Sequence, residues 1–227
     1  MAFSGFPESG LSFLRELAAH NDRDWFEAHR KEWDDGIVPA MLALCEALKA
    51  RLRDVLPALQ FVPRVGGSIY RLNRDIKFSR DKSPYKTYTA ALLWEAGGEK
   101  HDMPGFYLRI APGELLLAGG IWLFEEARLD RFRKKLHNPA AAARLDDALA
   151  VAKKGGLKVD ASEMLTRPPR GFTPEHERAE LSKHKGLVVA KSQKPAAWLH
   201  DAGALDQFEA VARAYAPLHL WMRDELL

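Results

Sequence analysis

The residues best suited to chemistry lie in one basic stretch, residues 71–86, which reads R-L-N-R-D-I-K-F-S-R-D-K-S-P-Y-K. It contains six cationic side chains and two carboxylates: Arg71, Arg74, Lys77, Arg80, Lys82 and Lys86 against Asp75 and Asp81. The stretch therefore carries a net charge of +4, while the whole chain carries only +3. Phe78 and Tyr85 interleave with the charges, which is typical of a segment held against a folded core and not of a disordered tail. The sequence thus predicts an ordered surface that attracts anions.

Such a surface suits a phosphate or carboxylate group, because guanidinium forks bind these groups bidentately and ammonium groups add point charges. If residues 68–72 form a strand, the basic stretch becomes a loop at one end of a sheet, with its cations directed into one region. The predicted ligand-binding residues are Arg71, Arg74, Asp75, Lys77, Arg80, Asp81, Lys82, Tyr85 and Lys86. In an enzyme, Asp75 or Asp81 would be the nearby general base and Tyr85 a proton donor. The sequence does not reveal a reaction, so no catalytic residue is assigned.

Two other interpretations of the basic stretch stay open. In one, its aspartates pair with the arginines, and the loop is a structural or interaction element with a self-paired network of charges. Two carboxylates cannot neutralise six cations, and a surface ion pair contributes under about 1 kcal/mol, so an anion site is favoured. In the other, the stretch joins the basic cluster 131–135 in a nucleic-acid-binding module, although base-stacking aromatic residues are not evident in the required order.

Other kinds of site have weaker support. Asp75 and Asp81 do not have the spacing of metal ligands, and the flanking lysines would oppose a cation. The eight histidines include no H-E-x-x-H motif, so no metal site is predicted. The two S-x-x-K matches, at Ser79 and Ser83, lack the companion motifs of serine acyl transferases. No Rossmann or Walker loop is present, so no cofactor is predicted. Trp25 is expected to pack in the core and not to cover the site.

Composition places the chain among ordinary soluble globular proteins, since 47% of its 227 residues are apolar and 29% are charged. No window approaches eighteen uninterrupted apolar residues, and the first ten residues lack the features of a signal peptide. The single cysteine excludes an intramolecular disulfide and a cysteine-based zinc cluster. We therefore expect a cytoplasmic protein whose partner is an anionic small molecule, with nucleic acid as the second choice and no membrane partner.

Hydrophobic periodicity predicts helices in the first and last thirds of the chain and strands in the middle. Helices are expected over about 11–20, 22–33, 39–56, 129–136, 139–154, 173–185 and 205–226, with Asp34-Asp35-Gly36 ending the second. Strands are expected over 68–72, 88–95, 106–111, 115–118 and 187–190, the third and fourth joined by the turn Pro112-Gly113. The chain is therefore expected to form one α+β domain over residues 1–227, with a mainly antiparallel sheet of about four or five strands flanked by N- and C-terminal helices.

Several of these segments resemble a conserved hypothetical family of bacteria and fungi, the domain of unknown function two-four-six-one. The matching residues are Asn21, Trp25-Phe26, Arg71, the signature R-D-I-K-F-S-R-D-K-S-P-Y-K over 74–86, Gly105-Phe106-Tyr107-Leu108, Gly119-Gly120, Trp122 and Lys185. The resemblance covers nearly the whole chain, and the 74–86 signature is specific. The chain departs from the family pattern at Ala118, where a third glycine is expected, and at residues 123–125, which replace a proline-containing segment. The resemblance implies a single α+β domain and no assigned activity.

Overall fold

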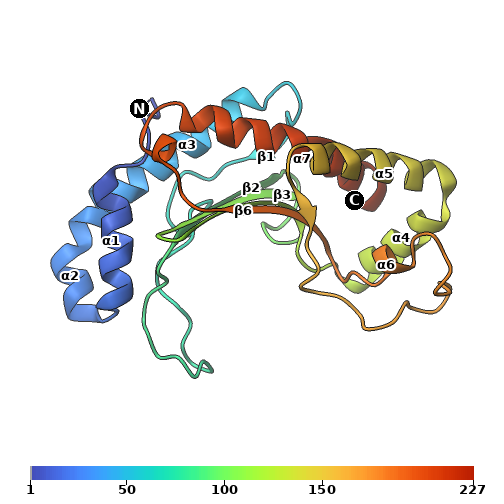
Figure 1. Cartoon of the computed structure of the whole chain (residues 1–227), viewed down its shortest axis with the longest axis horizontal. Helices are drawn as coiled ribbons and strands as arrows, with labels where there is room; N and C mark the ends of the chain where they lie inside the picture. The colour runs from blue at the N-terminus through green and yellow to red at the C-terminus, as the bar shows by residue number, and fades with distance from the viewer. Residues whose placement is uncertain (1) are drawn as a thin grey trace.

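The computed structural model describes residues 2–227, and its centre is one six-stranded sheet (Figure 1). Every strand pairs antiparallel with its neighbours, in the order β1-β2-β3-β4-β6-β5. The strands are β1 (Leu59–Gln60), β2 (Thr89–Glu95), β3 (Gly105–Ala111), β4 (Glu114–Ile121), β5 (Lys158–Val159) and β6 (Leu187–Gln193). The predicted α+β class with an antiparallel sheet is confirmed. The sheet has more strands than the four or five expected, because the two-residue strands β1 and β5 are too short to give a sequence signal.

Helices precede and follow the strands along the chain. They are α1 (Glu8–Ala19), α2 (Arg23–Lys31), the π-helix η1 (Glu32–Ile37), α3 (Val38–Arg51), α4 (Glu126–His137), α5 (Pro139–Lys154), α6 (Ala179–Ser182), the 3-10 helix η2 (Ala197–His200) and α7 (Ala204–Leu226). Figure 1 shows α3, α5 and α7 above the sheet, with α1 and α2 at one end and α4 and α6 towards the other. The concave lower face of the sheet has no helix lying across it within the described chain (Figure 1). No helix in residues 2–227 has both the length and the apolar composition needed to cross a membrane.

The alternation of side chains along the strands separates the core from the open face. On β3, Phe106 and Leu108 are fully buried on the side of α7, whereas Tyr107 and Arg109 lie on the open face. The ring of Tyr215 on α7 is also fully buried, and its centroid lies 6.2 Å from that of Phe106. The alternate residues of the strands that point to one face thus pack against the apolar stripe of α7. The opposite face of the sheet is not covered by that helix.

A close approach of α7 to the sheet requires a glycine at one position of β4. An added Cβ on Gly119 would lie 2.4 Å from ring carbons of Tyr215, a contact that real Cβ atoms do not make. The ring has no free space to move into, because protein interiors are close-packed. Gly119 therefore sets the distance between α7 and β4.

Local signals in the sequence specify several element boundaries as predicted. The Asp22 carboxylate accepts a hydrogen bond from the Trp25 backbone N–H at 2.9 Å and caps α2. The Asn138 side chain caps α5 in the same way through the Ala141 N–H at 3.0 Å. The Pro112-Gly113 turn joins β3 and β4, which pair directly from Ala111 and Glu114 onward.

The predicted end of the second helix at Asp34-Asp35-Gly36 is wrong. The chain continues from α2 through the π-helical turn η1 directly into α3. Trp33 and Ile37 are buried in this segment, so the packing of their side chains outweighs the weak helix propensity of aspartate and glycine.

Two other predicted elements are shorter than expected. Residues 68–72 form only isolated bridges, from Ile69 to Ala91 and to Val65, because Leu72 instead accepts a hydrogen bond from the Lys86 N–H at 2.8 Å. In the predicted helix 173–185, only α6 is α-helical. Within that segment, the His176 ring accepts a hydrogen bond from the Arg178 backbone N–H at 3.0 Å, and such local bonds compete with a helix.

Candidate functional site

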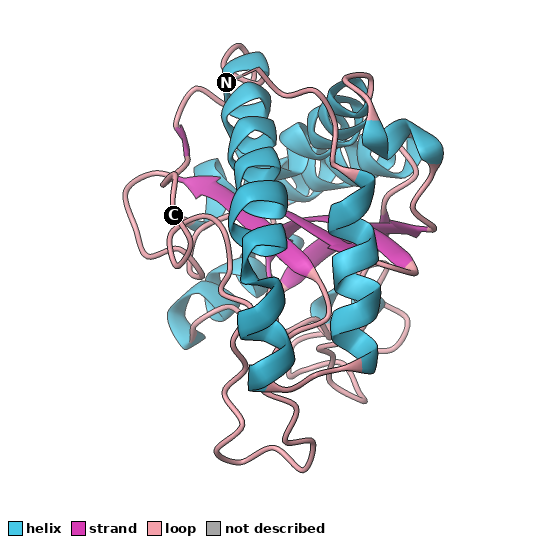
Figure 2. Ribbon diagram, turned by 90° about the vertical axis from the view of Figure 1, so that its left-hand side faces the viewer, coloured by secondary structure: helices cyan, strands magenta, loops and turns pink. Residues whose placement is uncertain are grey.

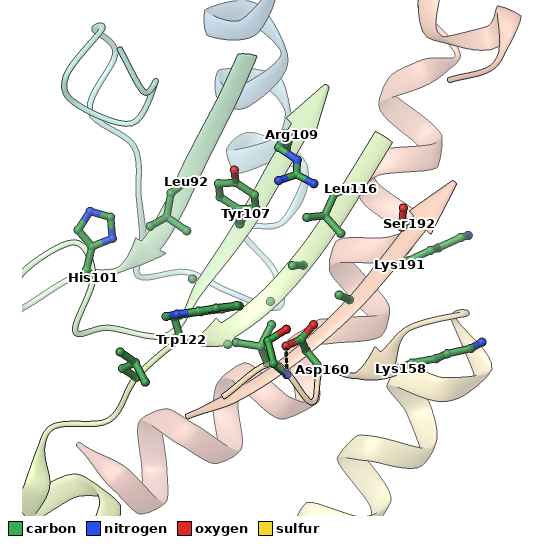
Figure 3. Close-up of a pocket in the computed structure, with 18 of the residues that line it drawn as sticks. Leu92, His101, Tyr107, Arg109, Leu116, Trp122, Lys158, Asp160, Lys191 and Ser192 are labelled. Carbon is green, nitrogen blue, oxygen red and sulfur yellow. Dashed lines mark hydrogen bonds between the residues drawn. The ribbon is translucent and has the colours of Figure 1, made fainter. Parts of the chain in front are cut away.

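The open face of the sheet carries a cavity of about 1040 Å³, drawn in Figure 3. Its floor consists of residues from β2, β3, β4 and β6, and several of them are small: Gly105, Ala118, Gly120 and Ala190. These positions have no side chain long enough to fill the space above the sheet. Leu92, Leu116 and Val188 give the floor an apolar character. The volume is at the upper end of the range for small-molecule sites, so the cavity can hold a ligand of substantial size.

The rim of the cavity includes two exposed apolar residues that follow β4. Trp122 is 52% exposed and Leu123 is 48% exposed, and both line the cavity. In Figure 3 the Trp122 side chain lies across the lower part of the cavity. Leu123 and the floor residue Ala118, both at positions where the sequence was expected to depart from the family pattern, line this cavity.

Lys100 and Tyr70 form one end of the cavity. The Lys100 Nζ lies 3.8 Å from the centroid of the Tyr70 ring and donates a hydrogen bond to the Gly67 carbonyl at 2.5 Å. The Lys86 Nζ lies 5.7 Å from the centroid of the same ring and donates to the Arg71 carbonyl at 2.9 Å. Two ammonium groups thus share one aromatic ring, and neither forms a salt bridge with any described residue.

Burial and like charge alter the ionisation of this end. Burial, together with the nearby charge of Lys86, lowers the pKa of Lys100 to about 8. Burial raises the pKa of Tyr70 to about 12 and also raises the pKa of Tyr107, so both phenols stay protonated and can donate hydrogen bonds near pH 7. Burial and the Lys100 charge lower the pKa of His101, which keeps this imidazole neutral.

Charges at another part of the cavity neutralise one another. The Arg109 guanidinium pairs with the Glu114 carboxylate, which also accepts a hydrogen bond from the Ser192 hydroxyl at 2.8 Å. The hydroxyl of Ser192, followed by the Arg109 guanidinium, lowers the pKa of Glu114. The Asp160 carboxylate also has a local partner, because it accepts a hydrogen bond from the Ser162 backbone N–H at 2.9 Å (Figure 3).

The structure separates the predicted ligand-binding residues of the basic stretch into two groups. Five of the nine line a second, open hollow of about 550 Å³: Arg74, Asp75, Asp81, Tyr85 and Lys86. The other four do not line it: Arg71, Lys77, Arg80 and Lys82. The six cations therefore do not converge on one hollow, because residues 73–83 form a loop that projects from the molecule in both views (Figures 1 and 2).

Within this hollow, the loop satisfies much of its own charge. The Arg74 guanidinium pairs with the Asp81 carboxylate and donates to the Ser83 carbonyl at 3.2 Å. Asp75 accepts a hydrogen bond from the Lys77 backbone N–H at 3.1 Å. Part of the self-paired network considered from the sequence is thus present, and Lys86 remains the hollow's cation without a carboxylate partner among the described residues.

Tyr85 and Trp25 both take part in packing. The Tyr85 side chain is buried and stacks on Phe26 with 4.3 Å between the ring centroids. Trp25 is partly buried against the core, stacks on His29 at 4.1 Å and lines neither the cavity nor the hollow. This is the role in the core that the sequence favoured for Trp25.

Sequence reasoning missed the principal cavity. Alternation along β3 would have placed Tyr107 and Arg109 on one face and Phe106 and Leu108 on the other, but the strand register was needed to bring Leu92 to the face of Tyr107. Lys100 gave no comparable signal, because its place beside Tyr70 depends on how the β2–β3 connection folds back over the sheet. Across residues 2–227, no group of three or more histidine, cysteine or acidic side chains could hold a metal ion.

Comparison with known proteins identifies the family of the chain but no characterised relative. A search of curated proteins and a search of solved structures each gave no significant match. A family model described as "Conserved hypothetical protein (DUF2461)" matches residues 9–221, a range that includes every strand of the sheet and the whole basic stretch 71–86. The protein is therefore a member of the DUF2461 family of conserved hypothetical proteins.

Proposed function

We propose that the protein binds a small organic anion in the cavity on the open face of the sheet. Its phosphate or carboxylate group would lie at the end formed by Lys100 and Tyr70, and its apolar body would cover the floor around Leu92. The observation that carries this proposal is the pair of ammonium groups, Lys100 and Lys86, beside one aromatic ring, neither of which pairs with a carboxylate within residues 2–227.

Two like charges held close together in a partly buried place raise the free energy of the unoccupied site. An anion between or beside them relieves this repulsion, because opposite charge within about 4–6 Å stabilises both charged forms. The protonated Tyr70 and Tyr107 hydroxyls add hydrogen-bond donors that suit an oxyanion. This proposal places the anion on the sheet and not in the projecting loop. Lys86 lines the hollow and not the cavity, but its Nζ lies 5.7 Å from the Tyr70 ring at the cavity's end.

The rest of the cavity supports a ligand with an uncharged body. Leu92, Leu116 and Val188 would contact apolar or aromatic groups, and Trp122 at the rim offers a face on which a planar ring can stack. A mixture of a broad apolar floor and a few convergent polar groups is typical of sites for small organic molecules.

The side chains of the cavity favour binding over covalent catalysis. The Ser192 hydroxyl contacts a carboxylate, but the Glu114 pKa is lowered and its charge is shared with Arg109, so Glu114 is a weak base for activating a nucleophile. Burial and the Lys100 charge lower the pKa of His101, which makes this imidazole a weak base as well.

A thermal-shift screen of nucleotides, sugar phosphates and aryl or alkyl carboxylates tests the proposal. A ligand present at a hundred times its dissociation constant stabilises the fold by about 2.7 kcal/mol, which raises the Tm of a chain of this size by roughly 5–10 °C. We expect Lys100→Met to abolish the shift and Lys100→Arg to retain most of it. A shift of full size in Lys100→Met, or a preference for single-stranded oligonucleotides with a steep salt dependence, would contradict the proposal.

Binding should also weaken as the pH rises through about 8. The ammonium form of Lys100 attracts the anion, and its pKa of about 8 means that this form is lost above that pH. We expect the affinity to fall by up to about tenfold per pH unit above pH 8. It should level off once Lys100 is deprotonated in the complex as well as in the free protein. Calorimetric titration from pH 6 to 10 measures the effect. The Lys100→Arg variant is the control, because a guanidinium stays charged and this variant should show no loss of affinity near pH 8.

A further inference from the structure

We propose that the projecting loop, residues 73–83, docks on an anionic phospholipid surface. The Phe78 ring would enter the interface between headgroups and acyl chains, while Lys77, Arg80 and Lys82 contact the anionic headgroups. This contact involves a part of the chain outside the cavity and does not depend on the function proposed for it.

The loop is fixed at its base and free at its tip. Tyr85 and Asn21 exchange two hydrogen bonds of 3.0 Å between side chain and backbone, and Tyr85 stacks on Phe26 of α2. Asn73 and Tyr85 also form a backbone bridge where the two arms of the loop meet. Figures 1 and 2 both show the loop extending beyond the rest of the molecule. Its tip can therefore reach a flat surface without any rearrangement of the sheet.

The tip presents an aromatic ring to solvent. Phe78 is 90% exposed, more than any other large hydrophobic side chain in residues 2–227. The Lys77 Nζ lies 5.2 Å from the centroid of its ring. Single exposed apolar side chains are common on protein surfaces. Here the ring lies on a projection among cations, which is the arrangement that suits the boundary between lipid headgroups and acyl chains.

Both carboxylates of the loop are exposed but accept hydrogen bonds from the loop itself, whereas its tip cations have no carboxylate partner in the described chain. Asp81 accepts hydrogen bonds from the Ser83 hydroxyl at 2.6 Å and the Ser83 backbone N–H at 2.9 Å and pairs with Arg74, and these contacts lower the pKa of Asp81 to about 2. Asp75 likewise accepts the backbone N–H of Lys77. By contrast, none of the three tip cations forms a salt bridge within the described chain. They are Lys77, Arg80 and Lys82, all exposed; the Lys82 Nζ donates a hydrogen bond to the Ile76 carbonyl at 2.9 Å.

The extent of the charge favours a lipid surface over a nucleic acid. The helices α1 and α2 beside the loop carry four exposed acidic and four exposed basic residues, so they add no net charge and the basic excess belongs to the projection. A nucleic acid needs a longer basic track with successive stacking platforms. A bilayer needs only an apolar tip with a few cations near its surface, and such a contact requires no membrane-spanning helix. One aromatic ring with three cations predicts weak, reversible binding.

Co-sedimentation of the full chain with vesicles tests this proposal. We expect the protein to pellet with phosphatidylcholine vesicles that contain about one third phosphatidylglycerol and to remain in solution with pure phosphatidylcholine. Each basic residue near such a surface changes the affinity by about fivefold, so replacing Lys77, Arg80 and Lys82 together by glutamine should reduce binding by at least about tenfold. Phe78→Ser should reduce it severalfold at unchanged charge, and its circular dichroism and Tm should be unaltered because the ring makes little contact with the core.

Matched controls lie on α4 and α5. Lys134, Lys153 and Lys154 are exposed and form no salt bridge in the described chain, so their joint replacement by glutamine changes the net charge equally. Val151→Ser removes an exposed apolar side chain elsewhere. Both control variants should bind anionic vesicles as the unaltered chain does.

A fluorescent probe can locate the tip directly. The only cysteine of the chain, Cys45, is fully buried, so the Phe78→Cys variant can be labelled at the tip with a polarity-sensitive dye. Anionic vesicles should shift its emission to the blue and brominated lipid should quench it, whereas a dye at Val151→Cys should show neither effect. The proposal is overturned by absence of binding to anionic vesicles, by loss of binding only in the charge variant, or by loop-dependent binding of single-stranded DNA with no binding to vesicles.

Discussion

Replacing Glu95 by leucine, or His219 by leucine, should lower the free energy of unfolding by about 3–5 kcal/mol. The two side chains form a hydrogen bond of 2.7 Å between the imidazole Nε2 and the carboxylate Oε2. Both are buried, with 0% of the His219 side chain and 7% of the Glu95 side chain exposed. Either single replacement leaves the other polar group in the core with no partner and no access to water, which is the main source of the cost.

The double variant separates loss of a partner from loss of volume. Leucine at both positions removes both polar groups, so we expect it to be clearly more stable than either single variant. Urea denaturation of the four proteins gives the complete double-mutant cycle. Additive effects of the two replacements would show that the pair has no coupling. Ligand binding in the cavity should persist in the double variant, because Glu95 at the end of β2 and His219 on α7 lie on the core side of the sheet.

The second large effect is expected for Gly119→Ala, which should destabilise the fold by about 1–3 kcal/mol. The added methyl group would lie 2.4 Å from the Tyr215 ring, and the fully buried ring has no space into which it can rotate. At an unstrained position, the same change would stabilise the protein by up to about 1 kcal/mol, because alanine lowers the conformational entropy of the unfolded chain. The sign of the effect therefore reports on the close approach of α7 to β4.

Gly113 offers the matched control for this prediction. It lies in the turn between the same two strands, and an added Cβ would meet no atom within 4 Å. We expect Gly113→Ala to change the free energy of unfolding by no more than about 0.5 kcal/mol. A second check combines Gly119→Ala with Tyr215→Val, which makes room for the methyl group and should reduce the cost of the first change. Equal stabilities of the Gly119→Ala and Gly113→Ala variants would contradict this account of the interface.

Local signals in the sequence predicted most of the elements. The capping side chains of Asp22 and Asn138, the Pro112-Gly113 turn and the two-residue period of β2 and β3 all act within a few residues, and the structure agrees with them. The signals failed where distant packing competes with local preference. Trp33 and Ile37 hold the chain helical through Gly36, and the arm that contains Lys86 takes the hydrogen-bond partner that residues 68–72 needed to extend their strand.

The sequence by itself determined the α+β class, the antiparallel sheet, the family and the concentration of positive charge in residues 71–86. Only the tertiary structure decided where that charge lies and where the cavity on the open face of the sheet forms. Tyr70, Lys100 and Ser192 line one cavity although they are distant in the chain, because strand register and the folding of the β2–β3 connection bring them to the same face of the sheet. Such contacts depend on pairings over long sequence separations, which no local pattern of residue types encodes.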